Sequence, residues 1–119
     1  MKLVFVYGTL KRGFANHNFL AGQAFLGDAV TGPGYALYDL GDYPGMVARA
    51  GSAGAITGEV WSVDAACLAQ LDALEGTAEE MYRRACVPLL APFADRPVET
   101  YIYLRGVEGR PLVGTAWTK

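Results

Sequence analysis

The sequence predicts an α+β fold in which a small, mostly antiparallel β-barrel carries a few short helices. Three observations predict it: apolar runs of strand length are numerous, helical stretches are few, and the two do not alternate in a regular βαβ rhythm. The chain has 119 residues, of which 52% are hydrophobic, which is enough apolar material for one core. We therefore expect residues 1–119 to form a single domain.

The expected strands take up most of the chain. The first covers residues 3–7, a β-branched and aromatic run that stops at Gly8. Residues 24–40 are expected to form one or two strands interrupted at Gly32-Pro33-Gly34, and turn signals follow at residues 42–45 and 51–54. Further strands are expected over residues 55–63, 85–90 and 98–104, whereas the glycine-rich stretch from residue 106 is expected to be peripheral.

A short helix is expected soon after the first strand. Asn16 is its candidate N-cap, and Phe19 and Leu20 would turn inward. His17 is the only histidine of the chain. A lone histidine near a helix start more commonly anchors a loop than catalyses a reaction, so we expect His17 to be structural.

The main helix is expected over residues 64–76, because Asp64 can cap its N-terminus and Gly76 can end it. At about 100° per residue its apolar side chains gather on one face, and Glu75 projects from that face. A carboxylate there is costly unless it is partnered or protonated, and the negative helix C-terminus also opposes ionisation. Both effects would raise the pKa of Glu75, which suits a residue that accepts a proton and returns it near neutral pH.

Two alternatives remain open for this carboxylate. Glu75 could swing out to water or pair with Arg83 or Arg84, because charged residues are mostly exposed. Asp72 is the rival acid/base residue, but it lies about 110° from the centre of the apolar face, against about 50° for Glu75. We therefore favour Glu75 as the catalytic residue.

The first strand runs directly into Tyr7-Gly8-Thr9-Leu10. A glycine after a buried strand lets the backbone turn sharply and expose successive N–H groups, which can hold an anion or an oxyanion. An ordinary strand-ending turn would account for the glycine as well.

Three tyrosines are further candidates for the walls of a cavity. Tyr43 lies in the turn at residues 42–45 and could line a pocket or cover a sheet edge. Tyr82 and Tyr101 could border the same cavity or pack in the core with their hydroxyl groups satisfied.

Charge and cysteine content exclude several classes of function. The formal net charge of −2 comes from scattered residues, so nucleic acid is not expected as a partner. The apolar runs are too short to span a bilayer and the N-terminus does not resemble a leader, so we expect a cytoplasmic protein without a membrane partner. Cys67 and Cys86 are expected to be free, buried thiols, and neither they nor the one histidine have the spacing of a zinc site. Neither a metal nor a cofactor is expected.

A resemblance to a known family begins in residues 4–13, which read Val-Phe-Val-Tyr-Gly-Thr-Leu-Lys-Arg-Gly and are followed by Asn16-His17. They resemble the opening of the γ-glutamylcyclotransferase-like superfamily, and most closely its γ-glutamylamine cyclotransferase branch. A second match comprises Gly-Glu-Val-Trp at 58–61, Leu-Asp-Ala-Leu-Glu-Gly at 71–76 and Tyr-Arg-Arg at 82–84. The two motifs in order are more specific than either alone, and together they cover nearly the whole chain.

The resemblance implies a small barrel with a cavity, in which the loop of residues 7–10 binds a γ-glutamyl substrate and Glu75 is the acid/base residue. The α-amine of the γ-glutamyl group would attack its own γ-carbonyl, giving 5-oxoproline and releasing an amine or amino acid. γ-Glutamyl amines, γ-glutamyl-ε-lysine, γ-glutamyl dipeptides and γ-glutamylated biosynthetic intermediates are all compatible with the motifs. The expected substrate-binding residues are Tyr7, Gly8, Thr9, Leu10, Tyr43 and Tyr82.

The competing interpretation is a non-catalytic domain that keeps the barrel and pocket in order to hold a small metabolite or an assembly partner. Glu75 separates the two, because a binding module has no need of a proton-shuttling carboxylate on an inward helical face.

Overall fold

The computed structural model describes residues 1–118. Within this range the chain forms, in order, strand β1 (Lys2–Val6), the 3-10 helix η1 (His17–Leu20), strands β2 (Ala24–Val30), β3 (Tyr35–Asp39), β4 (Pro44–Ala48) and β5 (Thr57–Val63), helix α1 (Ala65–Leu74), and strands β6 (Tyr82–Cys86) and β7 (Val98–Tyr103). The mixed α+β class is therefore confirmed.

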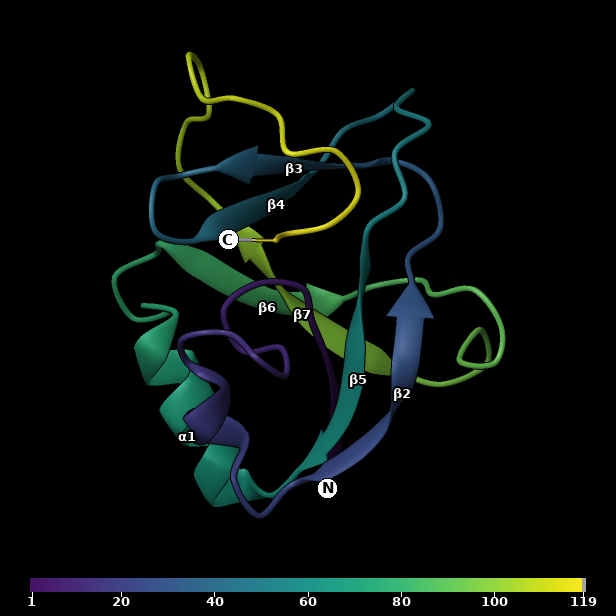
Figure 1. The fold of residues 1–119 in the computed structure, drawn as a ribbon, viewed down its shortest axis with the longest axis vertical. Coiled ribbons are helices and arrows are strands. Elements are labelled where there is room, and N and C mark those ends of the chain that lie inside the picture. Colours follow the sequence, from purple (N-terminus) through teal and green to yellow (C-terminus); the bar gives the residue numbers. More distant parts are fainter. Residues whose placement is uncertain (119) are drawn as a thin grey trace.

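Five strands form one mixed sheet in the order β2-β5-β1-β7-β6, and β3 and β4 form a separate hairpin (Figure 1). The pairing is antiparallel except between β1 and β7, which run parallel. The expected small barrel is supported only loosely, because the sheet is not closed: β2 and β6 are its two edges and do not pair with each other. The chain instead packs the β3–β4 hairpin and its C-terminal segment beside the sheet.

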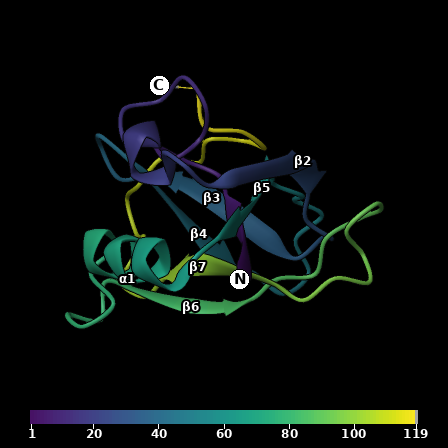
Figure 2. The same ribbon diagram turned by 90° about the horizontal axis from the view of Figure 1, so that it is seen from below.

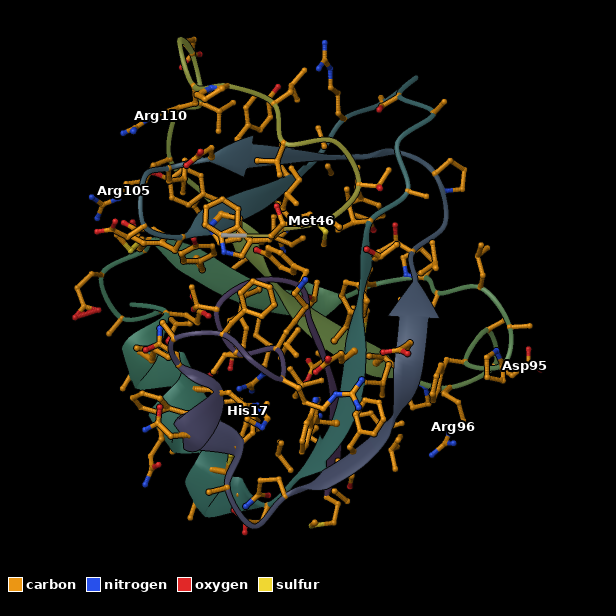
Figure 3. All side chains as sticks on the ribbon, viewed as in Figure 1. His17, Met46, Asp95, Arg96, Arg105 and Arg110 are labelled. Carbon is orange, nitrogen blue, oxygen red and sulfur yellow. The ribbon has the colours of Figure 1, made fainter. Side chains whose placement is uncertain are left out.

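Strand β1 lies at the centre of the sheet, and its side chains alternate between two core clusters. Val4 and Val6 pack with Leu71 of α1, whereas Phe5 packs with Met46 of the hairpin. Because both faces of β1 are covered, the strand is apolar from Leu3 to Val6 instead of alternating with polar residues. Met46 lies inside the molecule in Figure 3, while the labelled Asp95, Arg96, Arg105 and Arg110 are exposed.

Helix α1 begins and ends at the residues that the sequence indicates. The Asp64 carboxylate accepts a hydrogen bond from the backbone N–H of Cys67 at 2.7 Å, which satisfies a donor at the helix start. Gly76 has φ +67°, the left-handed conformation that commonly ends a helix. The helix packs beside η1 (Figure 2), and these two elements cover one face of the sheet.

Local details of three elements differ from expectation. The turn between β3 and β4 is closed by the bond from Leu40 N–H to the Tyr43 carbonyl, so Pro44 already belongs to β4. Strand β6 covers Tyr82–Cys86 and not residues 85–90, since Pro88 has no N–H for a ladder. Asn16 makes no side-chain cap of η1; its side-chain NH2 group donates to the Thr9 hydroxyl.

Cys86 is exposed, which contradicts the expected burial, whereas Cys67 is buried; both thiols are free. Cys86 ends β6, an edge strand of the sheet, so its side chain is left uncovered. Among residues 1–118, no helix is long and apolar enough to span a bilayer.

The C-terminal segment is exposed over residues 108–112, as expected of a peripheral stretch, but the expectation is wrong for the stretch that ends at Trp117, which reaches the core. Trp117 is 1% exposed and joins the cluster around Phe5. The backbone N–H of Val113 donates to the Leu37 carbonyl at 2.9 Å, and the N–H of Thr57 donates to the Thr115 carbonyl at 2.8 Å. These bonds fix the segment against β3 and β5.

Candidate active site

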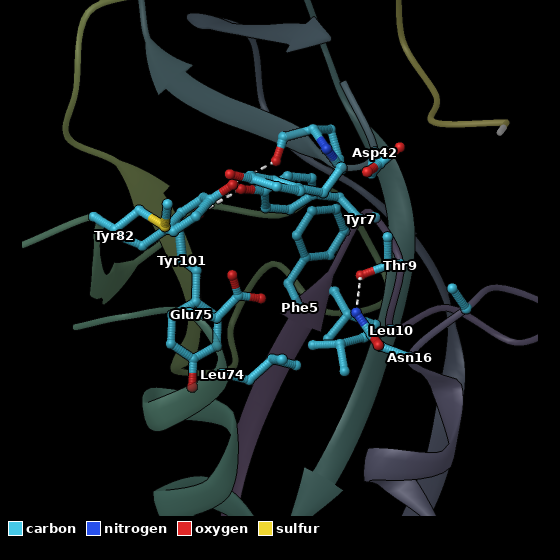
Figure 4. Close-up of a pocket in the computed structure, with 16 residues that line it drawn as sticks. Phe5, Tyr7, Thr9, Leu10, Asn16, Asp42, Leu74, Glu75, Tyr82 and Tyr101 are labelled. Carbon is cyan, nitrogen blue, oxygen red and sulfur yellow. Dashed lines mark hydrogen bonds between the residues drawn. The ribbon is translucent and has the colours of Figure 1, made fainter. Parts of the chain in front are cut away.

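A pocket of about 380 Å³ lies between the end of β1, the C-terminal end of α1 and the turn that joins β3 to β4 (Figure 4). Its inner wall consists of buried side chains such as Phe5 and Tyr101, and exposed residues such as Ala15 and Asp42 mark its opening. The fold brings together in it every residue predicted for the site: Tyr7, Gly8, Thr9, Leu10, Tyr43, Glu75 and Tyr82. Their roles stay predictions.

Glu75 lies at the C-terminal end of α1 with its carboxylate directed into the pocket (Figure 4). Its position is fixed by the backbone, because its N–H donates to the Leu71 carbonyl at 2.9 Å and Gly76 then turns the chain away. Burial raises the pKa of Glu75 from 4.5 to about 7, since removal from water disfavours the charged form. Within residues 1–118 the carboxylate has no ion pair and no hydrogen bond.

The rival carboxylate, Asp72, is occupied by other side chains. One of its oxygens accepts a hydrogen bond from the Arg84 guanidinium, and the other accepts one from the Tyr101 hydroxyl at 2.7 Å. Arg84 also lies 3.3 Å from the Glu99 carboxylate. The alternative in which Arg84 pairs with Glu75 is therefore excluded, and Asp72 does not line the pocket.

The loop of residues 7–10 lines the pocket. A Cβ on Gly8 would lie 2.7 Å from Cγ of Pro44, so the close approach of the hairpin requires glycine at this position. The N–H groups of Gly8, Thr9 and Leu10 find no acceptor within the part of the chain that the structure describes. Three successive unpaired N–H groups beside a cavity can bind an anion.

Asn16 and His17 hold this loop in place. The Asn16 side-chain amide donates to the Thr9 hydroxyl at 2.9 Å, and the Asn16 N–H donates to the Thr9 carbonyl at 2.8 Å. Nδ1 of His17 lies 3.1 Å from the Leu10 carbonyl, and its ring packs against Trp61. His17 does not line the pocket, in agreement with the structural role expected for it.

Two tyrosines form walls whose hydroxyl groups are already engaged. The Tyr7 hydroxyl donates to the Tyr101 carbonyl at 2.6 Å and accepts a bond from the Met46 N–H at 3.2 Å. The Tyr82 hydroxyl donates to the Pro44 carbonyl at 2.7 Å. Burial is the main cause that raises the pKa of both tyrosines above the ordinary value, so they remain neutral and join the hairpin to the sheet.

Sequence reasoning missed the role of Glu59, which is 6% exposed on β5. Its carboxylate accepts hydrogen bonds from the backbone N–H and the Nε of Arg12 and from Nε1 of Trp61, each at 3.1 Å. Glu59 thereby attaches Arg12, two residues after the loop of residues 7–10, to the sheet. A charged residue between Gly58 and Val60 in a buried strand was the available signal, since buried carboxylates require partners.

Sequence reasoning also missed Asn16 and Asp42 as pocket residues, since both were assigned only to local turns or caps. Among residues 1–118, His, Cys, Asp and Glu side chains nowhere gather in a group of three or more that could hold a metal ion.

The chain is similar to one described protein family, to curated proteins and to solved structures. The family described as "Gamma-glutamyl cyclotransferase, AIG2-like" matches residues 4–119. A Vibrio cholerae protein named "Putative gamma-glutamylcyclotransferase" is 48% identical over 101 residues, covering 85% of this chain and 81% of its own length. The γ-glutamylcyclotransferase family protein YtfP of Escherichia coli is 36% identical over 110 residues, covering 92% and 89%.

The crystal structure of an AIG2-like protein from Mus musculus has the same fold, with a TM-score of 0.74, 28% identity, and coverage of 97% of this chain and 87% of the mouse chain. The family match spans nearly all of the chain. The chain belongs to the γ-glutamyl cyclotransferase, AIG2-like family.

Proposed function

We propose that this protein converts a γ-glutamyl amine or γ-glutamyl peptide into 5-oxoproline and a free amine, with Glu75 as general acid and base. The observation that carries the proposal is the unpartnered Glu75 carboxylate in the pocket, whose pKa burial raises to about 7. A group with this pKa is present in both protonation states near neutral pH, as a residue that takes and returns one proton must be.

The reaction requires few protein groups because nucleophile and electrophile belong to one molecule. The α-nitrogen of the substrate forms a bond to its own γ-carbonyl carbon, and the bond from that carbon to the departing nitrogen breaks. The α-ammonium group loses two protons as its nitrogen becomes the lactam N–H. Glu75 takes one of them and delivers it to the departing nitrogen, and the second passes to the released amine, which becomes an ammonium ion, so no net proton is consumed. The pocket supplies the folded conformation that brings the two reacting atoms together.

The loop of residues 8–10 supports the same reaction. Its three N–H groups can stabilise the oxyanion that develops on the γ-carbonyl or hold the α-carboxylate of the substrate. The closed inner wall of Phe5, Tyr82 and Tyr101 keeps water away from these groups, which strengthens electrostatic interactions in the pocket.

The test is 5-oxoproline release from γ-glutamyl amines and γ-glutamyl dipeptides by wild type and by Glu75→Gln. We expect kcat to fall by about 10² to 10⁴, the usual contribution of a general acid–base residue. Glu79→Gln is the matched control, because it makes the same chemical change at an exposed position outside the pocket, and it should keep full activity.

The same variant separates catalysis from simple binding. A metabolite-binding domain would release no 5-oxoproline in either form, and full activity of Glu75→Gln would refute the assigned role of the carboxylate. The unfolding midpoint of each variant shows whether a loss of activity comes from unfolding.

A further inference from the structure

Asp72 lies three residues before Glu75 on helix α1, about 4.5 Å along the helix axis. Residues at this spacing are neighbours on a helix surface. The Asp72 carboxylate binds two groups from the sheet, the Arg84 guanidinium and the Tyr101 hydroxyl. Asp72 thus joins the end of α1 to strands β6 and β7 immediately beside the residue to which we assign the chemistry.

Arg84 stands on the face of the sheet that α1 covers. It lies directly opposite Tyr101 in the β6–β7 ladder and two residues after Tyr82, so the three side chains share one face. Tyr82 and Tyr101 line the pocket and pack in the core cluster between α1 and the sheet. Because Arg84 binds Asp72, its guanidinium lies within about one helical turn of Glu75.

Two carboxylates hold this guanidinium, and Asp72 is the one that Arg84 does not share. Nε of Arg84 lies 3.3 Å from Oε1 of Glu99, but the same oxygen lies 3.4 Å from Nζ of Lys2. Asp72 forms an ion pair with no second cation among residues 1–118. The Arg84 side chain is only 26% exposed, so its charge is weakly screened by salt.

The other titratable groups that line the pocket around Glu75 carry no positive charge. They are Tyr7 of β1, Asp42 and Tyr43 of the turn between β3 and β4, Tyr82 of β6 and Tyr101 of β7. Figure 4 shows the Glu75 carboxylate beside the Tyr101 ring. Burial is the main cause that raises the pKa of Tyr101, and the charges of Asp72 and Glu75 add to it. Tyr101 is therefore close to both carboxylates.

Further charged or titratable residues on the adjoining segments do not line the pocket: Lys11, His17, Glu79, Glu80, Arg83 and Arg105. Arg83 is exposed and points to the opposite face of β6 from Arg84, because neighbouring strand residues alternate. Arg105 is exposed as well. Arg84 is thus the arginine of β6 that stands on the same face of the sheet as the pocket.

We propose that Asp72 is a positioning residue of the active site: by binding the Arg84 guanidinium it keeps this cation away from Glu75, which is left without an ion-pair partner. The inference rests on the cyclotransferase reaction proposed above, in which Glu75 transfers the proton. A cation within about 4–6 Å stabilises the ionised form of a carboxyl group. An ion pair between Arg84 and Glu75 would therefore make Glu75 a weaker base.

Asp72→Asn tests the proposal on the protein alone. The amide keeps an acceptor oxygen for the Tyr101 hydroxyl but loses the charge that holds Arg84. Glu75 then lies beside an uncompensated cation, so the midpoint of its titration should fall from about pH 7 to about pH 6. The carbon-13 chemical shift of the Glu75 carboxyl carbon, followed by NMR as the pH is raised, measures the midpoint, and Glu75→Gln identifies the signal.

Arg84→Gln should shift the midpoint in the opposite direction. It leaves the Asp72 carboxylate without its cation, and a like charge beside Glu75 should raise the midpoint to about pH 7.5. The double variant Asp72→Asn/Arg84→Gln removes both charges and should titrate as wild type does, to within about 0.3 pH. Opposite shifts identify charge as the cause, because the loss of a merely structural contact has no preferred direction. Arg84→Gln also tests the proposal if Asp72→Asn does not fold.

Glu99→Gln is the matched control. It removes the other carboxylate from the same guanidinium, while Asp72 still binds Arg84. The midpoint of Glu75 should stay within about 0.3 pH of the wild-type value, since the cation remains compensated. A shift as large as that of Asp72→Asn would show that any charge near Arg84 has the same effect and would overturn the specific role of Asp72.

The titration decides the role of Asp72 independently of turnover. A midpoint in Asp72→Asn equal to that of wild type would overturn this role and leave the proposed reaction standing on 5-oxoproline release. The expected shifts without any release by wild type would support the role of Asp72 and overturn the reaction. If both hold, kcat/KM of Asp72→Asn should fall only about tenfold from pH 7 to pH 5, against about a hundredfold for wild type.

Discussion

Glu59 and Glu75 are both removed from most contact with water, but their surroundings differ completely. Glu59 accepts three hydrogen bonds, two of them from Arg12 at the end of the binding loop. Glu75 stands in the pocket with no partner among residues 1–118, and burial raises its pKa to about 7. One buried carboxylate is therefore fully paired, and the other, within the described chain, is unpaired in the pocket.

The difference shows how a fold assigns distinct roles to chemically identical side chains. A carboxylate with a cation and N–H donors holds its neighbours in place, because removing either partner leaves the other uncompensated. A carboxylate without partners keeps a labile proton near neutral pH and can exchange it with a ligand. Glu59 therefore stabilises the loop, and we assign the chemistry to Glu75.

The pH dependence of turnover is the strongest way to break this comparison. Because Glu75 must be ionised to accept a proton, kcat/KM should fall about tenfold per pH unit below pH 7, or about a hundredfold from pH 7 to pH 5. The α-ammonium of the substrate stays protonated over this range and adds no second acid limb. Steady-state kinetics on a γ-glutamyl amine measure the profile, and a limb centred near pH 4.5 would contradict it.

The pH dependence of the unfolding free energy is a second test of the difference between Glu59 and Glu75. Between pH 4.5 and 7 folded Glu75 keeps a proton that the unfolded chain has released, because its pKa is raised from 4.5 to about 7. Stability from this group is therefore full at low pH and is lost as the pH rises through 7. From pH 5 to pH 7 wild type should lose about 2 kcal/mol of unfolding free energy relative to Glu75→Gln.

Urea unfolding of both proteins at pH 5, 6, 7 and 8 measures this change as a difference between two curves. Glu79→Gln, at an exposed carboxylate, should follow wild type at every pH. A constant difference between wild type and Glu75→Gln across the series would show that the folded state does not perturb the carboxyl group.

Glu75 could be predicted from the sequence because the signals that place it are local. Asp64 and Gly76 mark the ends of one helix, and the helical period then fixes the face from which Glu75 projects. The loop after β1 was likewise marked by Gly8, although the reason for glycine is the approach of Pro44. That contact lies far away in the sequence.

The features that could not be predicted depend on contacts between distant segments. The bond between Arg12 and Glu59 joins a loop to a strand 47 positions away, and neither residue indicates the other in the sequence. Trp117 packs beside Phe5 from the opposite end of the chain. Whether β2 and β6 meet to close a barrel depends in the same way on the path of every strand between them.

Glu59→Gln gives the smallest expected effect and tests the other member of the pair. The amide keeps one acceptor oxygen but loses the charge that binds Arg12, whose side chain is 48% exposed. Because water partly compensates an exposed guanidinium, we expect a loss of about 1.5 kcal/mol in unfolding free energy, measured by urea unfolding at pH 7. The acid limb of kcat/KM should remain near pH 7, since Glu75 is untouched.

Asp28→Asn removes only the solvent-exposed partner of the same Arg12 and should change stability much less. If Glu59→Gln instead abolished turnover without loss of stability, Glu59 would share in the chemistry, and hydrogen-bond partners would not distinguish the two carboxylates.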